Sequence, residues 1–257
     1  MKKLVVAALV AAGFIGVLTI GTAGSRADES HELTVFAAAS LRESFEDLAK
    51  TFEAKSPGVK VRLNLAGSQE LRTQIENGAR VDVFASADQK HMAALAKDKL
   101  VGPAKVFARN TPVVIVPKGN PAKVGSFEQL ANAKKIVIGV PEVPIGTYTL
   151  EILDKAGADF KQKVLANVAS RELNVRQVLA KVTLGEADAG VVYRTDATAG
   201  KDKVEIIEIP AKVNVVAEYP VAVLAKAPQA AAAKAFVELL LSADGQKRLA
   251  AAGFVAP

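Results

Sequence analysis

The chain has 257 residues, of which 50% are hydrophobic and 23% are charged, and its formal net charge at pH 7 is +6. This composition is typical of a globular protein with one large core or two smaller ones, and it excludes a fibrous or intrinsically disordered chain. The absence of cysteine excludes disulfides, thiolate metal sites and a cysteine nucleophile. The excess positive charge is too small to indicate nucleic-acid binding.

The first 27 residues have the pattern of a secretory signal peptide. Two lysines open the chain, an apolar run extends from Leu4 to Ile20, and small residues lead to Ala27. We expect cleavage near Ala27, which removes three cations and no acid. The alternative is a retained membrane anchor, because the apolar run approaches the length of a spanning helix. Without a cysteine to carry a lipid, we expect a free periplasmic protein and not a lipoprotein.

Strands and helices are predicted to alternate along the rest of the chain. The predicted strands cover residues 33–39, 59–65, 81–85, 112–117, 135–140, 188–193, 204–209 and 220–225. Helical spacing of apolar side chains runs from Leu41 to Phe52, through Leu71 and Ile75, around Met92 and Leu95, and over 126–132, 147–156, 174–184, 230–241 and 243–252. This order predicts an α/β fold with mostly parallel sheets covered by helices. The length is compatible with one sheet or with two.

Motifs for catalysis are not found. The chain has no glycine-rich phosphate loop, no G-x-S-x-G elbow and no H-E-x-x-H pair. Its two histidines, His31 and His91, lie near no candidate nucleophile or second ligand, and we expect both to be solvated. We therefore expect a binding protein rather than an enzyme, although an enzyme of similar architecture remains an alternative.

Two serines follow predicted strands and open predicted helices. Ser40 follows three alanines, and Ser68 follows Ala66 and Gly67. The first N–H groups of a helix lack internal partners and carry a partial positive charge, which suits an anion. Further helix starts lie at 141–148 and 173–176, and Tyr193 ends a strand. Because ligands of α/β sheets bind beyond the carboxyl ends of strands, these features favour an anion site.

Each feature also has a purely structural interpretation. Ser40 with Glu43 forms the S-x-x-E pattern of a capping box, and a serine at a helix N-cap needs no ligand. Tyr193 is compatible with a half-buried strand end, and Pro144 with Gly146 is compatible with a turn. The residues by themselves thus indicate an α/β protein with several helix starts able to bind an anion.

Seven segments of the sequence together resemble the periplasmic molybdate-binding proteins of ABC transporters. They are T-V-F-A-A-A-S-L at 34–41, A-G-S-Q-E-L at 66–71, D-V-F-A-S-A-D-Q-K at 82–90, V-P-I-G-T-Y at 143–148, N-V-R-Q-V-L at 174–179, G-V-V-Y at 190–193 and E-Y-P-V-A-V at 218–223. The resemblance implies the type II periplasmic-binding-protein fold, with two α/β lobes and a ligand cleft between them. On this basis we expect residues 28–111 plus 221–257 to form one lobe and 112–220 the other, with hinges near 111–117 and 218–221.

The resemblance also implies a ligand and the residues that bind it. The ligand is molybdate or tungstate, bound as the oxyanion by the hydroxyls of Ser40, Ser68 and Tyr193 and by the backbone N–H groups of Ile145 and Val175. No cofactor is implied, and no side chain coordinates the metal directly. The expected partner is an ABC transporter permease at the inner membrane, and the expected state is a monomer that binds no nucleic acid.

Other ligands remain as alternatives, and the chain departs from the family pattern at two positions. The ligand could be sulfate, a small organic acid or an amino acid, and the last two would require an anchor such as Arg42 or Arg176. The family often has a second serine where this chain has Gly67, and alanine where it has Ile145. We expect Arg176 to be solvated or structural rather than a ligand of the anion.

Overall fold

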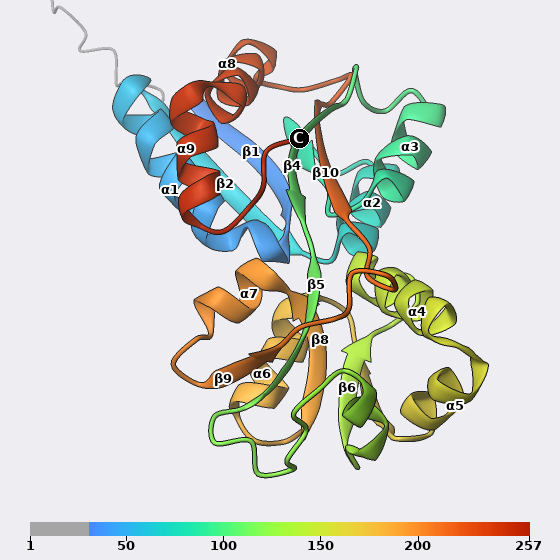
Figure 1. Ribbon diagram of the computed structural model, residues 1–257. Helices are drawn as coiled ribbons and strands as arrows, with labels where there is room; N and C mark the ends of the chain where they lie inside the picture. The colour runs from blue at the N-terminus through green and yellow to red at the C-terminus, as the bar shows by residue number, and fades with distance from the viewer. Residues whose placement is uncertain (1–30) are drawn as a thin grey trace, which may run out of the picture.

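The computed structural model describes residues 31–257, and the expected signal peptide over 1–27 lies outside the described residues. Two five-stranded sheets lie one above the other, each with helices packed against it (Figure 1). No helix within residues 31–257 is long and apolar enough to cross a membrane. The predicted α/β fold with two sheets is confirmed, and the question of one sheet or two is answered.

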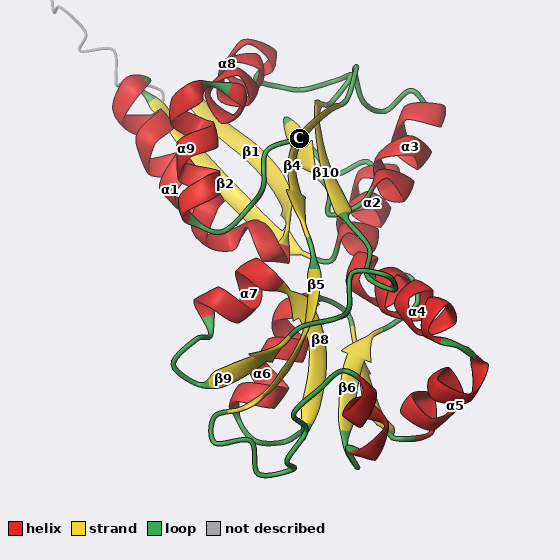
Figure 2. Cartoon of the chain, in the orientation of Figure 1, coloured by secondary structure: helices red, strands yellow, loops and turns green. Residues whose placement is uncertain are grey.

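The first sheet has the strand order β2-β1-β3-β10-β4. Its strands are β1 (His31–Ala38), β2 (Val59–Ala66), β3 (Val83–Ala85), β4 (Lys105–Asn110) and β10 (Ala217–Val223). Its helices are α1 (Arg42–Lys55), which follows a 3-10 turn over Ala39–Leu41, α2 (Ser68–Glu76), α3 (Gln89–Lys97), α8 (Ala230–Leu241) and α9 (Ala243–Ala251). Helices α1, α8 and α9 pack together, and α2 packs with α3 on the other side of the sheet (Figure 2).

The second sheet has the order β7-β6-β8-β5-β9. Its strands are β5 (Pro112–Pro117), β6 (Ile136–Gly139), β7 (Val168–Glu172), β8 (Ala189–Tyr193) and β9 (Val204–Ile207). Its helices are α4 (Pro144–Ala156), α5 (Ala158–Ala166), α6 (Val175–Thr183) and α7 (Arg194–Ala199), together with a 3-10 segment over Glu128–Asn132. The apolar face of α6, with Val178 and Val182 fully buried, packs on β8 and β6.

The chain crosses between the sheets twice. It first passes through Thr111 from β4 into β5, and later returns from β9 to β10 (Figure 1). Strands joined through helices, such as β1 with β2 and β6 with β7, are parallel, as expected. The strands at the crossings, β5 and β10, are antiparallel to their neighbours. The chain enters each of these strands directly from the other sheet, without a helix that would bring it back to run in the same direction as the neighbouring strand. The sheets are therefore more mixed than the predicted mostly parallel arrangement.

Four elements were not predicted, and their sequences explain why. Strand β4 contains Lys105, Arg109 and Asn110, and β7 is a partly exposed edge strand, so neither has an apolar alternation. Helix α5 buries only Val164, and α7 is a single short helix of six residues. Strand β10 begins at Ala217, earlier than predicted, because Pro220 lies at a register shift inside the strand and does not open it.

Candidate functional site

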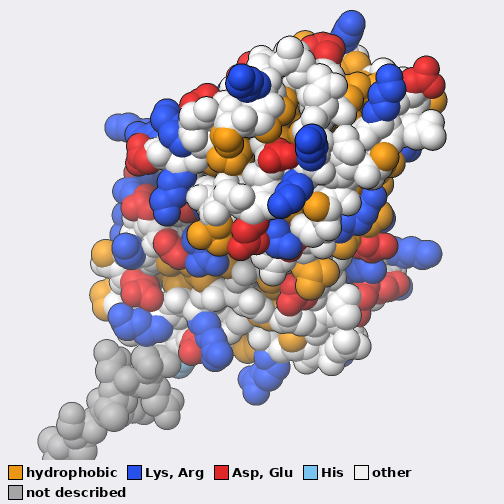
Figure 3. All heavy atoms as spheres, turned by 90° about the horizontal axis from the view of Figure 1, so that it is seen from below, with side chains coloured by type: hydrophobic (Ala, Val, Ile, Leu, Met, Phe, Trp, Pro, Cys, Tyr) orange, Lys and Arg blue, Asp and Glu red, His pale blue; other side chains and the backbone are white. Residues whose placement is uncertain are grey.

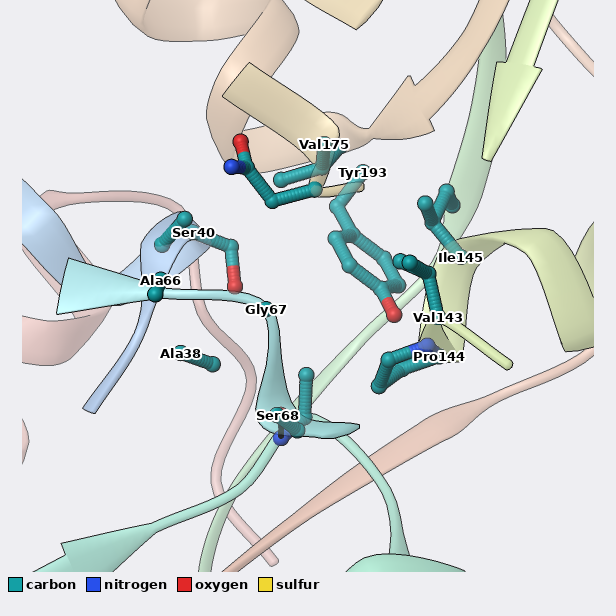
Figure 4. Close-up of a pocket in the computed structure, with 13 residues that line it drawn as sticks. Ala38, Ser40, Ala66, Gly67, Ser68, Val143, Pro144, Ile145, Val175 and Tyr193 are labelled. Carbon is teal, nitrogen blue, oxygen red and sulfur yellow. Dashed lines mark hydrogen bonds between the residues drawn. The ribbon is translucent and has the colours of Figure 1, made fainter. Parts of the chain in front are cut away.

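A small pocket lies between the two sheets, where the carboxyl ends of several strands meet. Its lining comes from both sheets and consists of Ala38, Ala39, Ser40, Ala66, Gly67, Ser68, Ala87, Val143, Pro144, Ile145, Asn174, Val175 and Tyr193 (Figure 4). All five sequence-predicted site residues are in this set. Its cavity volume of about 10 Å³ is on the scale of one water molecule, so the walls must open to admit any ligand of several atoms, an oxyanion included.

Ser40 lies in the 3-10 turn that joins β1 to α1 and is 3% exposed. Its hydroxyl is 3.0 Å from the hydroxyl of Tyr219 on β10. The N-cap of α1 is Leu41, with no side-chain cap, so the predicted capping box is wrong. The reason is that the 3-10 turn places Ser40 one residue inside the turn, where its side chain faces the pocket instead of the helix start (Figure 4).

Ser68 is the first residue of α2 and is 1% exposed. Its Oγ accepts a hydrogen bond from the backbone N–H of Ala87 at 3.0 Å. Since that bond uses an oxygen lone pair, the hydroxyl hydrogen of Ser68 stays available as a donor. The N-cap of α2 is Gly67, so Ser68 is not a capping residue either. Both serines are thus buried donors that do not serve as helix caps.

Two helices of the second sheet begin at the pocket. Helix α4 starts at Pro144, and Ile145 carries its first backbone N–H, because proline has none. Helix α6 starts at Val175, and the side chain of its N-cap, Asn174, accepts hydrogen bonds from the N–H groups of residues 176 and 177 at 3.0 and 3.1 Å. This leaves the N–H of Val175 as the first helix donor without an intrahelical acceptor. Asn174 thereby orients the helix start, a role that sequence reasoning missed.

Tyr193 ends β8 and is 1% exposed. Its hydroxyl is buried and has no hydrogen-bond partner among residues 31–257. A buried hydroxyl without a partner is costly, and such groups are rare in folded proteins. Burial, followed by the neighbouring Tyr219 and Tyr148, raises the pKa of Tyr193 well above its usual value, so the group is a neutral donor. The side chain extends into the pocket and ends near Pro144 (Figure 4).

The lining of the pocket carries no charged side chain among the described residues. The same residues, 31–257, contain no cluster of three or more His, Cys, Asp or Glu side chains that could hold a metal ion. Hydroxyls and helix N-termini are the polar groups present. This arrangement can donate hydrogen bonds to an acceptor-rich ligand from several directions, and it supplies neither a nucleophile paired with a base nor metal ligands.

Gly67 has a packing role. A Cβ atom at this position would lie 2.4 Å from the carbonyl oxygen of Leu173, which belongs to the second sheet, and equally close to the side chain of Gln69. Gln69 Nε2 also donates to that carbonyl at 2.8 Å. A side chain at position 67 would therefore separate the two sheets beside the pocket. Ile145 is fully buried, and its side chain packs against Gly139.

Two expectations about charged residues have different outcomes. His91 is not solvated: it is 2% exposed, and its Nε2 lies 2.9 Å from the carbonyl oxygen of Glu142 across the seam between the sheets. Burial lowers the pKa of His91 although Asp88 opposes the shift. The polar sequence around position 91 concealed this contact, because its partner lies on the other sheet. Arg176 does not line the pocket and binds carboxylates instead, as the structural interpretation expected.

Comparison with known proteins agrees with this geometry. The family model of the bacterial extracellular solute-binding proteins matches residues 33–255. The chain belongs to this family. The expectation of a binding protein rather than an enzyme follows the family and is confirmed by it. The predicted resemblance is confirmed as well, because the molybdate-binding protein ModA of Mycobacterium tuberculosis is 39% identical over 257 residues, covering 98% of this solute-binding protein and 96% of the relative.

Solved structures give the same result at the level of the fold. The substrate-binding domain of a putative molybdenum ABC transporter from Clostridium difficile is 34% identical, with a TM-score of 0.67 over 89% of this chain and 100% of that one. The sulfate-binding protein SubI of Mycobacterium tuberculosis is 21% identical, with a TM-score of 0.80 over 88% of this chain and 87% of that one. At this identity SubI shows a shared fold and does not indicate a shared ligand.

Proposed function

We propose that this solute-binding protein captures molybdate outside the cytoplasm and delivers it to an ABC transporter. The observation that carries the proposal is the buried hydroxyl of Tyr193, which has no hydrogen-bond partner within residues 31–257 and lies in a small pocket lined by uncharged donors. The same ligand is supported by the relative named for molybdate binding and by the solved domain named for a putative molybdenum ABC transporter. Tungstate, which has the same shape and charge, belongs to the proposal as a second ligand.

In the proposed complex the hydroxyls of Ser40, Ser68 and Tyr193 and the N–H groups of Ile145 and Val175 donate to the oxyanion. Hydrogen bonds to a charged group contribute about 1.5–3 kcal/mol each. Five such donors give a gross sum above any realistic affinity, and the ordering of the lobes removes part of it. Binding of about −8 to −12 kcal/mol, micromolar to nanomolar, is the expected result.

Selectivity follows from the lack of a carboxylate among the described residues that line the pocket. A protonated oxyanion such as hydrogen phosphate would bury its own O–H without a charged acceptor and would use up a hydroxyl that otherwise donates to the anion, so the site favours fully deprotonated anions. Sulfate, which carries no proton at neutral pH, meets this requirement too and is the alternative ligand. The larger molybdate and tungstate ions can reach donors on all walls of the pocket at once, which the smaller sulfate does less well.

We further propose that the two sheets are lobes that close on the ligand. The first lobe is the predicted 28–111 plus the C-terminal part of the chain, and the second follows Thr111. Since β10 already belongs to the first sheet, we propose that the second hinge lies just before Ala217. The first hinge stays near 111–117. We also propose a free periplasmic monomer, with the signal peptide removed near Ala27, that docks on the permease in its closed form.

A thermal-shift and calorimetry panel of molybdate, tungstate, sulfate and phosphate tests the ligand. An anion at 100 times its dissociation constant adds about 2.7 kcal/mol of stability, so molybdate and tungstate should raise the melting temperature and phosphate should not. Ser40→Ala and Ser68→Ala should each weaken molybdate binding about tenfold or more. A response to sulfate alone would support the alternative ligand, and unchanged affinity in both variants would refute the site.

A further inference from the structure

A charged cluster lies at the seam between the lobes, just outside the pocket. Arg176 directly follows Val175 in α6, yet its side chain is not part of the pocket lining. The guanidinium contacts two carboxylates, those of Glu43 on α1 and Asp196 on α7. Helix α1 packs on the first sheet, whereas α6 and α7 pack on the second. The cluster therefore joins the two lobes through one charged pair.

The guanidinium of Arg176 lies between the two carboxylates and contacts each with different nitrogen atoms. Arg176 Nη1 donates to Glu43 Oε1 at 2.7 Å, and Nη2 donates to Glu43 Oε2, so the pair is bidentate. Arg176 Nε lies 2.7 Å from Asp196 Oδ1. The Asp196 side chain is fully buried, that of Arg176 is 17% exposed, and that of Glu43 is 50% exposed. This contact is an ion pair that lacks hydrogen-bond geometry, so the charge of the buried aspartate holds the guanidinium in place beside the other lobe.

We propose that Arg176 is a positioning residue that latches the closed form through Glu43 and does not touch the anion. This inference rests on the proposed function, because it concerns closure around the bound ligand. When the lobes separate, Arg176 keeps its buried partner Asp196 and exposes its free N–H groups to water. Only the pair with Glu43 forms on closure. Its free energy therefore contributes to the closed state alone.

Other polar contacts across the seam are of a different kind. Asn110 Nδ2 donates to Thr195 Oγ1 at 2.9 Å, and both groups are neutral. Two further contacts join a side chain to a backbone carbonyl. Gln69 Nε2 donates to the carbonyl oxygen of Leu173, and the ring of His91 contacts that of Glu142. Both use neutral side chains and backbone acceptors. The pKa of Glu43 is lowered: burial acts to raise it, but the hydrogen bond and the charge of Arg176 together outweigh burial. The latch is therefore an ion pair at neutral pH. It should make closure sensitive to salt, which the neutral contacts do not.

A matched pair of variants on α1 tests the latch. Glu43→Gln removes the partner of Arg176 across the seam. Asp47→Asn, one helical turn away, removes a partner of Arg248 within the first lobe, where Arg248 Nη1 donates to Asp47 Oδ2 at 2.6 Å. The two carboxylates are equally exposed, at 50% and 51%. The variants therefore differ mainly in whether the broken pair joins the lobes.

The measurements are the dissociation constant, the ligand release rate and the melting temperature without ligand. Glu43→Gln should raise the release rate and the dissociation constant about three- to tenfold and reduce their dependence on salt. Asp47→Asn should change them less than about twofold. Tyrosine fluorescence can follow release, because the chain has no tryptophan and its three tyrosines form edge-to-face contacts beside the pocket.

Two results would overturn the latch. One is equal release rates in wild type and Glu43→Gln. The other is a loss of unliganded stability in Glu43→Gln that Asp47→Asn does not show, since the residue would then stabilise the fold instead of the closed form. The comparison uses whichever anion of the panel the wild type binds. If that anion is sulfate, the molybdate proposal fails while the latch is still tested.

Discussion

At the scale of single residues, the Tyr193 hydroxyl is the most informative group in the structure. Ser40 and Ser68 have partners within the protein, Tyr219 and the N–H of Ala87, so replacing either serine disturbs the fold as well as the site. The Tyr193 hydroxyl has no partner in the described part of the chain and is buried at the pocket. It is therefore the position where binding can be separated from stability.

Tyr193→Phe should weaken anion binding about 10- to 100-fold, the loss of one hydrogen bond to a charged acceptor. The free energy of unfolding without ligand should stay the same or increase, because a buried hydroxyl without a partner is removed. Calorimetry and urea denaturation measure the two effects. Tyr219→Phe is the control: it breaks the bond to Ser40 and should lower stability. Similar losses of stability in both variants would contradict the assignment.

At the scale of elements, the starts of α4 and α6 provide donors that need no specific side chain. This is why a bulky residue such as Ile145 is compatible with the proposed site: its N–H is free to serve as a donor while its side chain packs in the core. The start of helix α6 is stabilised by its N-cap, because the Asn174 side chain accepts hydrogen bonds from the N–H groups of residues 176 and 177. Asn174 also lines the pocket. Charge at this cap should therefore affect the ligand directly.

Asn174→Asp should preserve the stability of the protein, because aspartate caps a helix as well as asparagine and favours its positive end. The added negative charge beside the pocket should weaken binding of a dianion about tenfold or more. Asn174→Ala, by comparison, should lower the free energy of unfolding by about 1 kcal/mol. Calorimetry with urea denaturation distinguishes them, and equal binding by wild type and Asn174→Asp would show that the anion lies elsewhere.

At the scale of the whole molecule, the two lobes are joined by their crossings and by contacts at the seam. On the face seen from the side of the second lobe, basic and acidic side chains are interspersed, so this face has no large patch of one charge (Figure 3). A buried carboxylate at the seam gives the molecule a pH dependence. Burial raises the pKa of Asp196 to about 6, from an ordinary 3.8, while the charge of Arg176 opposes the shift.

A raised carboxyl pKa means that the folded state binds more protons than the unfolded state between about pH 4 and 6. The contribution of Asp196 to stability is therefore fully present below about pH 4 and is lost as the pH rises through about 6. Relative to Asp196→Asn, the wild type should lose stability as the pH increases from 4 to 7. Urea denaturation of both proteins measures the difference, and a constant difference would contradict the buried ionisation.

The sequence by itself indicated most of the alternation of strands and helices, and the strand ends and helix starts that meet at the pocket. Both depend on local patterns: apolar spacing, and small residues with serines at strand ends. The assignment of Ile145 and Val175 as donors came from the family resemblance. The sequence did not determine β4, whose polar residues hide the alternation, or the start of β10, which lies before its internal proline. Pairing places them instead: β4 pairs with β10, and β10 pairs with both β3 and β4.

Only the tertiary structure decided which groups are free to bind. It showed that Ser40 and Ser68 are not caps, that the Tyr193 hydroxyl has no partner among the described residues, and that Gly67 and Arg176 act at the seam. Some of these partners lie on the other lobe, as for Arg176 and Glu43, and some lie on the same sheet but far along the chain, as for Ser40 and Tyr219, which are 179 positions apart. Burial and hydrogen bonding across such separations depend on how the strands are ordered and how the two lobes meet, which no local pattern encodes.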